Sequence, residues 1–259
     1  MLSASNVLAI PSGRTRWIAS LLFAIAFFGF WEYVGRTGDP LVLPPPSMVA
    51  AAFVDLVVTG QLWEALWPSL QLLAAGFAVA LIVGVVLGVL IGRSRTADLT
   101  LSPYLAALYA TPDIALVPII LVWFGFDFSG RVVVVFLSAI FPILYNVTAG
   151  VRQAPEDLID VARAFGARRM RVLLQVILPS ALPYIMAGIR LSIGRAVVGM
   201  AVAEVYLRLG GIGGLIYAYG ARFVTDYLIA AILILPILGI GLTRLLAYLE
   251  RRIAPWKTV

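Results

Sequence analysis

Three charged residues of this sequence lie inside long apolar stretches: Asp113, Arg195 and Glu204. A charge within a membrane helix costs about 2.5–3.5 kcal/mol on insertion scales, so such a residue usually faces a partner or a water-filled cavity. The three residues are therefore candidates for the lining or gate of a translocation path, or for a proton or ion route. Asp113 can instead cap a helix that restarts at Pro112. Arg195 can form a buried ion pair, and Glu204 can cap the glycine-rich loop that follows it.

The composition excludes most enzyme chemistry. The sequence contains no His and no Cys, which removes disulfides, thiolate chemistry, histidine metal ligands and histidine acid–base catalysis. The carboxylates do not cluster in or beside the apolar stretches, so we predict no catalytic site and no metal site. Of the 259 residues 62% are hydrophobic and 12% are charged, a composition that is typical of an integral membrane protein surrounded by lipid.

Six apolar stretches are long enough to cross a membrane as helices. They cover residues 17–34, 70–91, 101–124, 132–150, 184–207 and 227–243. The third stretch contains Pro103, Pro112 and Pro118, so we expect it to be broken or kinked beside Asp113. The sequence thus predicts an all-α integral membrane protein with six transmembrane helices.

Small residues recur every four positions along the second stretch. Gly84, Gly88 and Gly92 continue a series that begins with Gly76 and Ala80. On a helix this spacing forms a smooth seam along one side, which lets another helix approach closely. We therefore predict a role in helix packing for the seam rather than a role in a pore.

The basic residues predict the orientation. Thirteen of the 19 Lys and Arg residues fall on one side of the six predicted spans, and four fall on the other. Since cytoplasmic segments carry the excess of positive charge, both termini are predicted to be cytoplasmic. Residues 1–16 and 251–259 are expected to form cytoplasmic tails, and the glycine-rich residues 210–214 a flexible outer loop. This distribution also accounts for the net charge of +6 without nucleic-acid binding.

The polar segment 154–179 joins two of the apolar stretches on the predicted cytoplasmic side. Pro155 suits a first helical position, Glu156 and Asp157 place acids in a first turn, and Gly166 is a stop signal. These signals predict one short helix. Its apolar residues recur at i, i+3, i+4 and i+7 and form a small face that needs a partner: Leu158, Val161, Ala162 and Phe165.

The same segment resembles the "EAA" cytoplasmic loop of ABC importer permeases. That pattern is E-A-A, three residues, G, nine residues and I-x-L-P. Here Asp160-Val161-Ala162, Gly166 and Val176-x-Leu178-Pro179 stand at the same spacing, with Asp in place of Glu and Val in place of the first Ala. The segments 43–47, 112–125, 141–152 and 182–204 are similar to the nitrate/taurine/sulfonate type of these permeases, and the resemblance covers about residues 40 to 250.

The resemblance implies a type I (MetI-like) permease architecture in a bacterial inner membrane. It implies that the segment 154–179 couples the chain to a cytoplasmic ABC ATPase, with Leu178 and Pro179 setting the angle at which the chain re-enters the membrane. The coupling residues that it implies are Asp160, Val161, Ala162, Arg163, Phe165, Gly166, Leu178 and Pro179.

The resemblance also implies the partners. These are two ATPase copies, a second permease copy that makes a homodimer, and a periplasmic or lipid-anchored substrate-binding protein. The permease then has no cofactor and no enzymatic activity of its own, because ATP and Mg bind to the ATPase. The expected solute is a small anion such as a sulfonate, nitrate or carboxylate, although members of the family also carry neutral heterocycles. The alternative function is that of a secondary transporter or channel that works without ATP.

Overall fold

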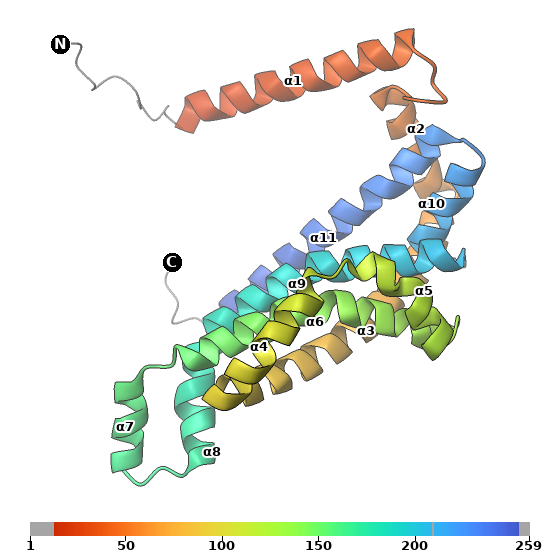
Figure 1. Ribbon diagram of the computed structural model, residues 1–259. Helices are drawn as coiled ribbons and strands as arrows, with labels where there is room; N and C mark the ends of the chain where they lie inside the picture. The colour runs from red at the N-terminus through yellow and green to blue at the C-terminus, as the bar shows by residue number, and fades with distance from the viewer. Residues whose placement is uncertain (1–12, 209, 254–259) are drawn as a thin grey trace, which may run out of the picture.

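The computed structural model describes residues 13–208 and 210–253, and every regular element in this part of the chain is a helix (Figure 1). The first half comprises α1 (Gly13–Thr37), α2 (Pro46–Val58), α3 (Gln61–Gly92), α4 (Arg95–Ala110), α5 (Asp113–Phe124) and α6 (Phe128–Arg152). The second half comprises α7 (Glu156–Ala164), α8 (Arg169–Val172), the π-helix η2 (Leu173–Ile177), α9 (Leu178–Leu207), α10 (Gly211–Ala221) and α11 (Thr225–Ile253).

The predicted set of membrane helices is confirmed. Within the described chain, five helical segments are long and apolar enough to cross a membrane: α1, α3, α6, the continuous rod α8–η2–α9, and α11. The pair α4 and α5 meets the same test only when its two helices are taken together, and it is bent by 97° at a short break; counted as one broken span, it makes the sixth. At the break Thr111 is extended (ψ 130°), as expected for a residue that precedes a proline, and Pro112 precedes the first residue of α5.

The helices α3, α6 and α9 form the core of the bundle, with α6 in contact with both of the others. The glycine seam of α3 lies against β-branched residues of α6. A Cβ atom added to Gly88 would lie 2.7 Å from Val147 Cβ, and one added to Gly84 would lie 3.0 Å from Ile143 Cγ2. The two helices can approach this closely only because the seam carries no side chains.

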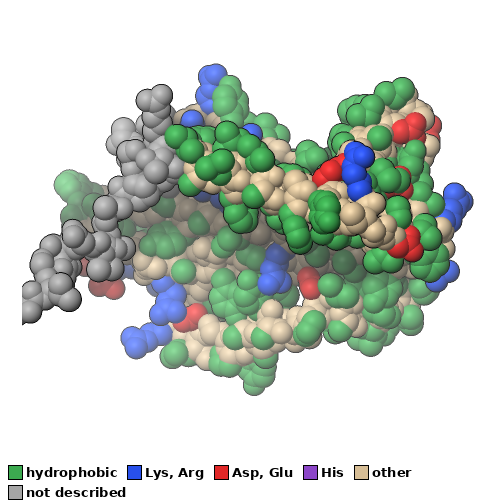
Figure 2. All heavy atoms as spheres, turned by 90° about the horizontal axis from the view of Figure 1, so that it is seen from above, with side chains coloured by type: hydrophobic (Ala, Val, Ile, Leu, Met, Phe, Trp, Pro, Cys, Tyr) green, Lys and Arg blue, Asp and Glu red, His purple; other side chains and the backbone are tan. Residues whose placement is uncertain are grey.

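The N-terminal helix α1 extends away from this bundle and packs mainly against α2 (Figure 1). Trp31 Nε1 donates to the Pro44 carbonyl at 3.1 Å, and the Glu32 carboxylate accepts from the Ser47 hydroxyl and backbone N–H. Most side chains of residues 17–37 are exposed although they are apolar, and hydrophobic side chains also cover much of the face in Figure 2. Such a surface suits lipid or another membrane helix.

A charged cap fixes the start of α6. The Asp127 carboxylate accepts from the backbone N–H groups of Ser129 and Gly130 and from the Ser129 hydroxyl. The Ser129 hydroxyl and the Gly130 N–H stabilise the ionised carboxylate, and they hold the pKa of Asp127 below its usual range.

The segment boundaries differ from the prediction at three places. The helix α1 begins at Gly13, four residues before the predicted span, and residues 1–12 of the predicted N-terminal tail lie outside the described residues. At the other end α11 continues to Ile253, and residues 254–259 also lie outside. The span predicted over 184–207 belongs to one helical rod from Arg169 to Leu207.

The prolines do not break this rod, so Leu178 and Pro179 lie in a continuous helix where the chain re-enters the membrane. Pro179 is the second residue of α9 and Pro183 lies inside it. The π-helix η2 ends two residues before Pro179, and it contains Gln175, the residue whose carbonyl the Pro179 ring would crowd in a regular α-helix.

The glycine-rich outer segment is not a flexible loop, so that prediction is wrong. Gly211 begins α10, an eleven-residue helix. Gly210 and Gly211 have positive φ angles of 56° and 72°, which turn the chain between α9 and α10 at little steric cost. The buried Glu204 carboxylate holds this helix through the backbone N–H of Gly213.

Candidate functional site

The short helix α7 lies beyond the bundle, at the end where α3 and α6 also finish; we call this the basic end (Figure 1). The helix starts with Glu156 and Asp157 in its first turn, which favours its N-terminus electrostatically. No residue of α7 is buried. Since a short helix is stable mainly through the packing of its apolar face, α7 is incomplete within this chain.

The turn after α7 depends on Gly166. Its φ is +77°, the left-handed region that favours glycine. Gly166 N donates to Arg163 O at 2.8 Å, and Ala167 N donates to Ala162 O at 3.0 Å, so the last carbonyl groups of α7 are satisfied. A Cβ atom at Gly166 would meet nothing within 4 Å, so the requirement for glycine is one of backbone conformation and not of space.

The predicted apolar face of α7 is divided between two environments. Leu158, Val161 and Phe165 are exposed, and Phe165 is 88% exposed. Ala162 is half-buried, as is Ile159 one turn earlier, and α7 contacts the π-helix η2. The exposed part is therefore open to a partner, while the other part positions α7 on the rod. Asp160 and Arg163 form an ion pair at 3.4 Å with both side chains exposed, which contributes little to stability.

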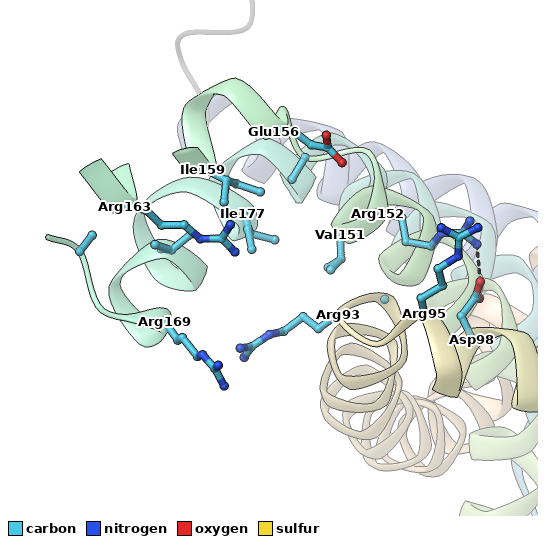
Figure 3. Close-up of a pocket in the computed structure, with 14 residues that line it drawn as sticks. Arg93, Arg95, Asp98, Val151, Arg152, Glu156, Ile159, Arg163, Arg169 and Ile177 are labelled. Atoms are coloured by element: carbon cyan, nitrogen blue, oxygen red, sulfur yellow. Dashed lines mark hydrogen bonds and ion pairs between the residues drawn. The ribbon is translucent and has the colours of Figure 1, made fainter. Parts of the chain in front are cut away.

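A cavity of about 820 Å³ lies between α7, α8 and the basic ends of α3, α4 and α6 (Figure 3). Five arginines line it against two carboxylates, so the cavity is strongly positive. Figure 3 shows Arg93, Arg163 and Arg169 with their side chains directed into this space. Such a field favours an acidic partner surface. Leu178 and Pro179 do not line it; they lie at the start of α9 in the rod.

One wall of the cavity is fixed by an ion pair between two helices. Arg152, the last residue of α6, contacts the Asp98 carboxylate in the first turn of α4 at 2.5 Å, and Ser102 Oγ donates to the other carboxylate oxygen at 2.8 Å. Asp98 is buried. The contact therefore ties the start of the broken span to the helix from which α7 follows.

Asp113 is the first residue of α5, directly after the break in the third span. One of its carboxylate oxygens accepts from Ile114 N at 3.0 Å. The carboxylate also lines a narrow space between α5, α6 and α9, together with Ser138 and Gly199. This position is compatible with both readings of the sequence, the helix start and the path.

Arg195 is exposed on α9, and its guanidinium carbon lies 4.7 Å from the centre of the Tyr109 ring at the end of α4. The Tyr109 ring in turn contacts Tyr145 and Phe141 of α6, with ring centres 5.5 Å and 6.0 Å away. Arg195 forms no ion pair with any carboxylate that the structure describes. The buried ion pair considered from the sequence is therefore absent in this part of the chain.

Glu204 lies near the outer end of α9 and is only 1% exposed. One carboxylate oxygen accepts from Ser69 Oγ of α3 at 2.7 Å, and the other accepts from Gly213 N of α10 at 2.9 Å. Ser69 Oγ also accepts from Ile212 N at 2.9 Å. We call these residues the Glu204 cluster. The cluster joins three helices and is buried, which fits the capping role that the sequence left open.

The structure does not bring Asp113, Arg195 and Glu204 together into one site. Sequence reasoning also missed the residues that complete their surroundings: Ser69, Tyr109 and Tyr145. Ser69 stands inside an apolar helix, where a lone serine more often bonds to its own backbone, and Ser69 Oγ does also contact Ala65 O. The aromatic residues have no sequence pattern that relates them to Arg195, because they come from different helices.

Comparisons with known proteins identify relatives of this chain. The family model described as "Binding-protein-dependent transport system inner membrane component" matches residues 80–255. A Bacillus subtilis (strain 168) protein named for aliphatic sulfonates transport is 33% identical over 249 residues, which cover 95% of this chain and 90% of that protein. The bicarbonate transport system permease protein of Synechococcus elongatus is 32% identical over 261 residues, with 93% of each chain covered.

Other matches extend the range of named solutes and support the fold. The riboflavin transport system permease protein of Chloroflexus aurantiacus is 34% identical over 230 residues, covering 88% of this chain and 86% of that protein. Among solved structures, the inward-facing MetNI methionine ABC transporter matches with a TM-score of 0.55 at 22% identity, over 71% of this chain and 95% of that chain.

Proposed function

Since the chain belongs to the family of binding-protein-dependent transport inner membrane components, the permease subunits of ABC importers, we propose that it forms the path by which a small organic or inorganic anion enters the cell. Family membership implies an ATPase and a substrate-binding protein as partners. The observation that supports the coupling role most directly is α7, a helix with no buried residue and an exposed apolar face.

We propose that a groove on the ATPase receives Leu158, Val161 and Phe165. Docking would remove three exposed apolar side chains from water, and each buried side chain of this size contributes about 1.5–3 kcal/mol. The Asp160 carboxylate, which stands 73% exposed beside Arg163, is available to the same partner. The positive cavity behind α7 favours an acidic rim on the ATPase.

The connections of α7 suit it to transmit movement. Only Gln153, Ala154 and Pro155 separate α7 from α6, and only four residues separate it from α8 and the rod. Both neighbours belong to the packed core, where α6 contacts α3 and α9. When closure of the ATPase dimer displaces α7, we expect α6 and the rod to tilt together and to expose the path alternately to the two sides.

We further propose that two copies of the permease enclose the path and engage two copies of the ATPase. Arg195 lies well inside α9 and is exposed in the single chain. A guanidinium at membrane depth faces protein or water rather than lipid, so this face needs a second copy to enclose it. The exposed apolar surface of α1 is a further surface that a second copy can cover.

Two of the named relatives transport anions, a sulfonate and bicarbonate, and this supports an anion as the solute. The relative named for riboflavin transport instead supports a neutral solute. An arginine without a carboxylate partner in the described chain favours the anion, because it makes the local potential of the path positive.

Purification from the native membrane tests this function. The solubilised chain is expected to copurify with an ATPase and, after reconstitution with its binding protein, to accumulate solute only when ATP is supplied. Phe165→Ala should reduce ATPase recovery at least about tenfold, since it removes an exposed apolar contact.

The matched control is Phe223→Ala, which removes a 74% exposed phenylalanine at the opposite end of the bundle and should leave ATPase recovery unchanged. A chain that purifies alone and moves solute in vesicles without ATP would instead be a secondary transporter or a channel, and the proposed function would be wrong.

A further inference from the structure

We propose that Arg195, Tyr109 and Tyr145 form an anion-binding subsite midway along the path, which takes the oxyanion head of a small sulfonate- or carboxylate-type solute. This inference rests on the proposed function, because it names a solute contact within the same path. It goes further by naming the residues, the chemistry that they recognise and the role of each.

The position of the three residues is the first argument. Arg195 stands 12 residues before the outer end of α9, which corresponds to about 18 Å along the helix axis, and 17 residues after the start of α9. Tyr109 is the penultimate residue of α4, directly before the break in the third span. Irregular backbone at this depth is tolerated only beside protein or a watery cavity, so the break and the exposed guanidinium both indicate the same wet surface.

The Arg195 guanidinium is only partly partnered within the described chain. The face of the Tyr109 ring attracts the guanidinium, but it accepts none of the five N–H donors in a directed hydrogen bond. No carboxylate of the described chain lies within ion-pair distance. The ring therefore holds the guanidinium in place while its donors stay available, and the planar fork of a guanidinium matches the oxygens of a carboxylate or sulfonate.

Tyr145 supplies an independent observation. Its hydroxyl is the one buried side-chain polar atom without a hydrogen-bond partner among the side chains that the structure describes, those of residues 17–208 and 210–252. A buried tyrosine hydroxyl normally has one. The Tyr145 ring lies 5.5 Å from that of Tyr109, and the Arg195 guanidinium carbon lies 4.7 Å from the centre of the same Tyr109 ring. Both side chains therefore contact one ring, and we place the bound oxyanion where it accepts from the guanidinium and from the unpaired Tyr145 hydroxyl.

Asp113 provides the competing explanation for Arg195. It lines the narrow space beside Gly199 of α9, one turn beyond Arg195, and its carboxylate is already bonded to Ile114 N. If Arg195 served only as an ion-pair partner for Asp113 in another conformation, removal of either charge would have the same effect. If Arg195 binds the solute, removal of the Asp113 charge should leave anion binding intact or strengthen it.

The test measures the thermal unfolding midpoint of the purified permease–ATPase complex against increasing ethanesulfonate or acetate, with sodium chloride at equal ionic strength as reference. A ligand that binds the folded state raises the midpoint. We expect a rise with either anion for the unmodified complex. The apparent dissociation constant should rise at least about tenfold in Arg195→Gln, which loses a charge-assisted hydrogen bond. It should rise about threefold in Tyr145→Phe, which loses a neutral one.

Three further variants separate binding from folding. Arg195→Lys keeps the charge but loses the planar fork, and should weaken binding less than Arg195→Gln does. Tyr109→Leu removes the ring that supports the guanidinium and should weaken binding. Arg190→Gln removes another arginine of α9, one that is paired with Glu250 at 2.7 Å, and should also leave binding unchanged.

The proposal is overturned if neither anion raises the midpoint above the chloride reference, or if Arg195→Gln responds as the unmodified complex does. It is also overturned if Asp113→Asn abolishes the response to the same extent as Arg195→Gln. ATP-driven uptake by the unmodified complex tests the proposed function separately, so an importer that lacks this subsite is distinguishable from a chain that is not an importer.

Discussion

The two ends of the helix bundle differ in how far the chain completes its own contacts. At the outer end, the Glu204 cluster lies at the junction of three helices, and both carboxylate oxygens accept hydrogen bonds from within the chain. At the basic end, α7 has no buried residue, and Phe165 is 88% exposed. The outer end is therefore closed by the chain itself, and the basic end remains open to another protein.

Charged residues have different roles at the two ends: one stabilises the fold, and the other is available to a partner. The Glu204 carboxylate fixes α10 on α3 and α9, so its removal should affect stability first. The carboxylate of Asp160 contributes little to the folded chain, because its ion pair is exposed, so its removal should affect the partner first. Substitutions at the two ends should therefore separate stability from coupling to the ATPase.

The largest effect is expected from Gly166→Asp. A residue with a Cβ is strained at φ +77°, and the new carboxylate lies beside the docking face. The chain should still insert in the membrane, while ATP-driven uptake falls at least about tenfold because α7 no longer docks correctly. Ala162→Asp should act in the same direction.

Gly60→Asp is the matched control for this variant. Gly60 has a φ of +84° and no atom within 4 Å of an added Cβ, as at Gly166, but it lies between α2 and α3 at the other end. The Gly60→Asp variant should lose about as much stability as Gly166→Asp does, but it should retain ATP-driven uptake. Normal uptake in Gly166→Asp would contradict the assignment of α7 as the coupling element.

Glu204→Ala is expected to lower the free energy of unfolding by about 2–4 kcal/mol. The change leaves Gly213 N without its acceptor in a buried site, leaves Ser69 Oγ only the Ala65 carbonyl as acceptor, and creates a cavity. Glu204→Gln keeps the volume and one acceptor oxygen, so its loss should be smaller. Thermal melts of the purified complex would measure both, and an unchanged midpoint in Glu204→Ala would show that the cluster does not hold α10.

Gly88→Ala should cost about 1–3 kcal/mol, because the new methyl group would lie 2.7 Å from Val147 Cβ in the seam between α3 and α6. The control is Gly239→Ala in α11, where an added Cβ meets nothing within 4 Å and helix propensity favours alanine. The same melts compare the two variants. If Gly88→Ala and Gly239→Ala shift the unfolding midpoint equally, close packing of α3 on α6 does not require glycine at position 88.

The smallest effect on stability is expected from Asp160→Asn, about 0.5 kcal/mol or less, since both members of its ion pair are exposed. ATPase recovery in a pull-down should nevertheless fall, because the carboxylate is available to the partner. Stability and coupling would then be separated in one variant. A large loss of stability without loss of the ATPase would reverse the roles assigned to the two ends.

The sequence by itself determined the features that depend on neighbouring residues. The lengths of the apolar stretches predicted the membrane helices, the three prolines predicted the break at residues 111–112, and the four-residue glycine spacing predicted a packing seam. The signals around Pro155 and Gly166 predicted α7. These features follow from helix periodicity and local backbone sterics, which operate over a few residues.

Only the tertiary structure decided the contacts between distant segments. Ser69 meets Glu204 across 135 residues, and Tyr109 supports Arg195 from a different helix. The same packing made residues 211–221 a helix that is held by Glu204, and it joined α8, η2 and α9 into one rod where the sequence predicted a span that begins at residue 184. A local pattern cannot encode these outcomes, because the burial of a side chain depends on which helix covers it.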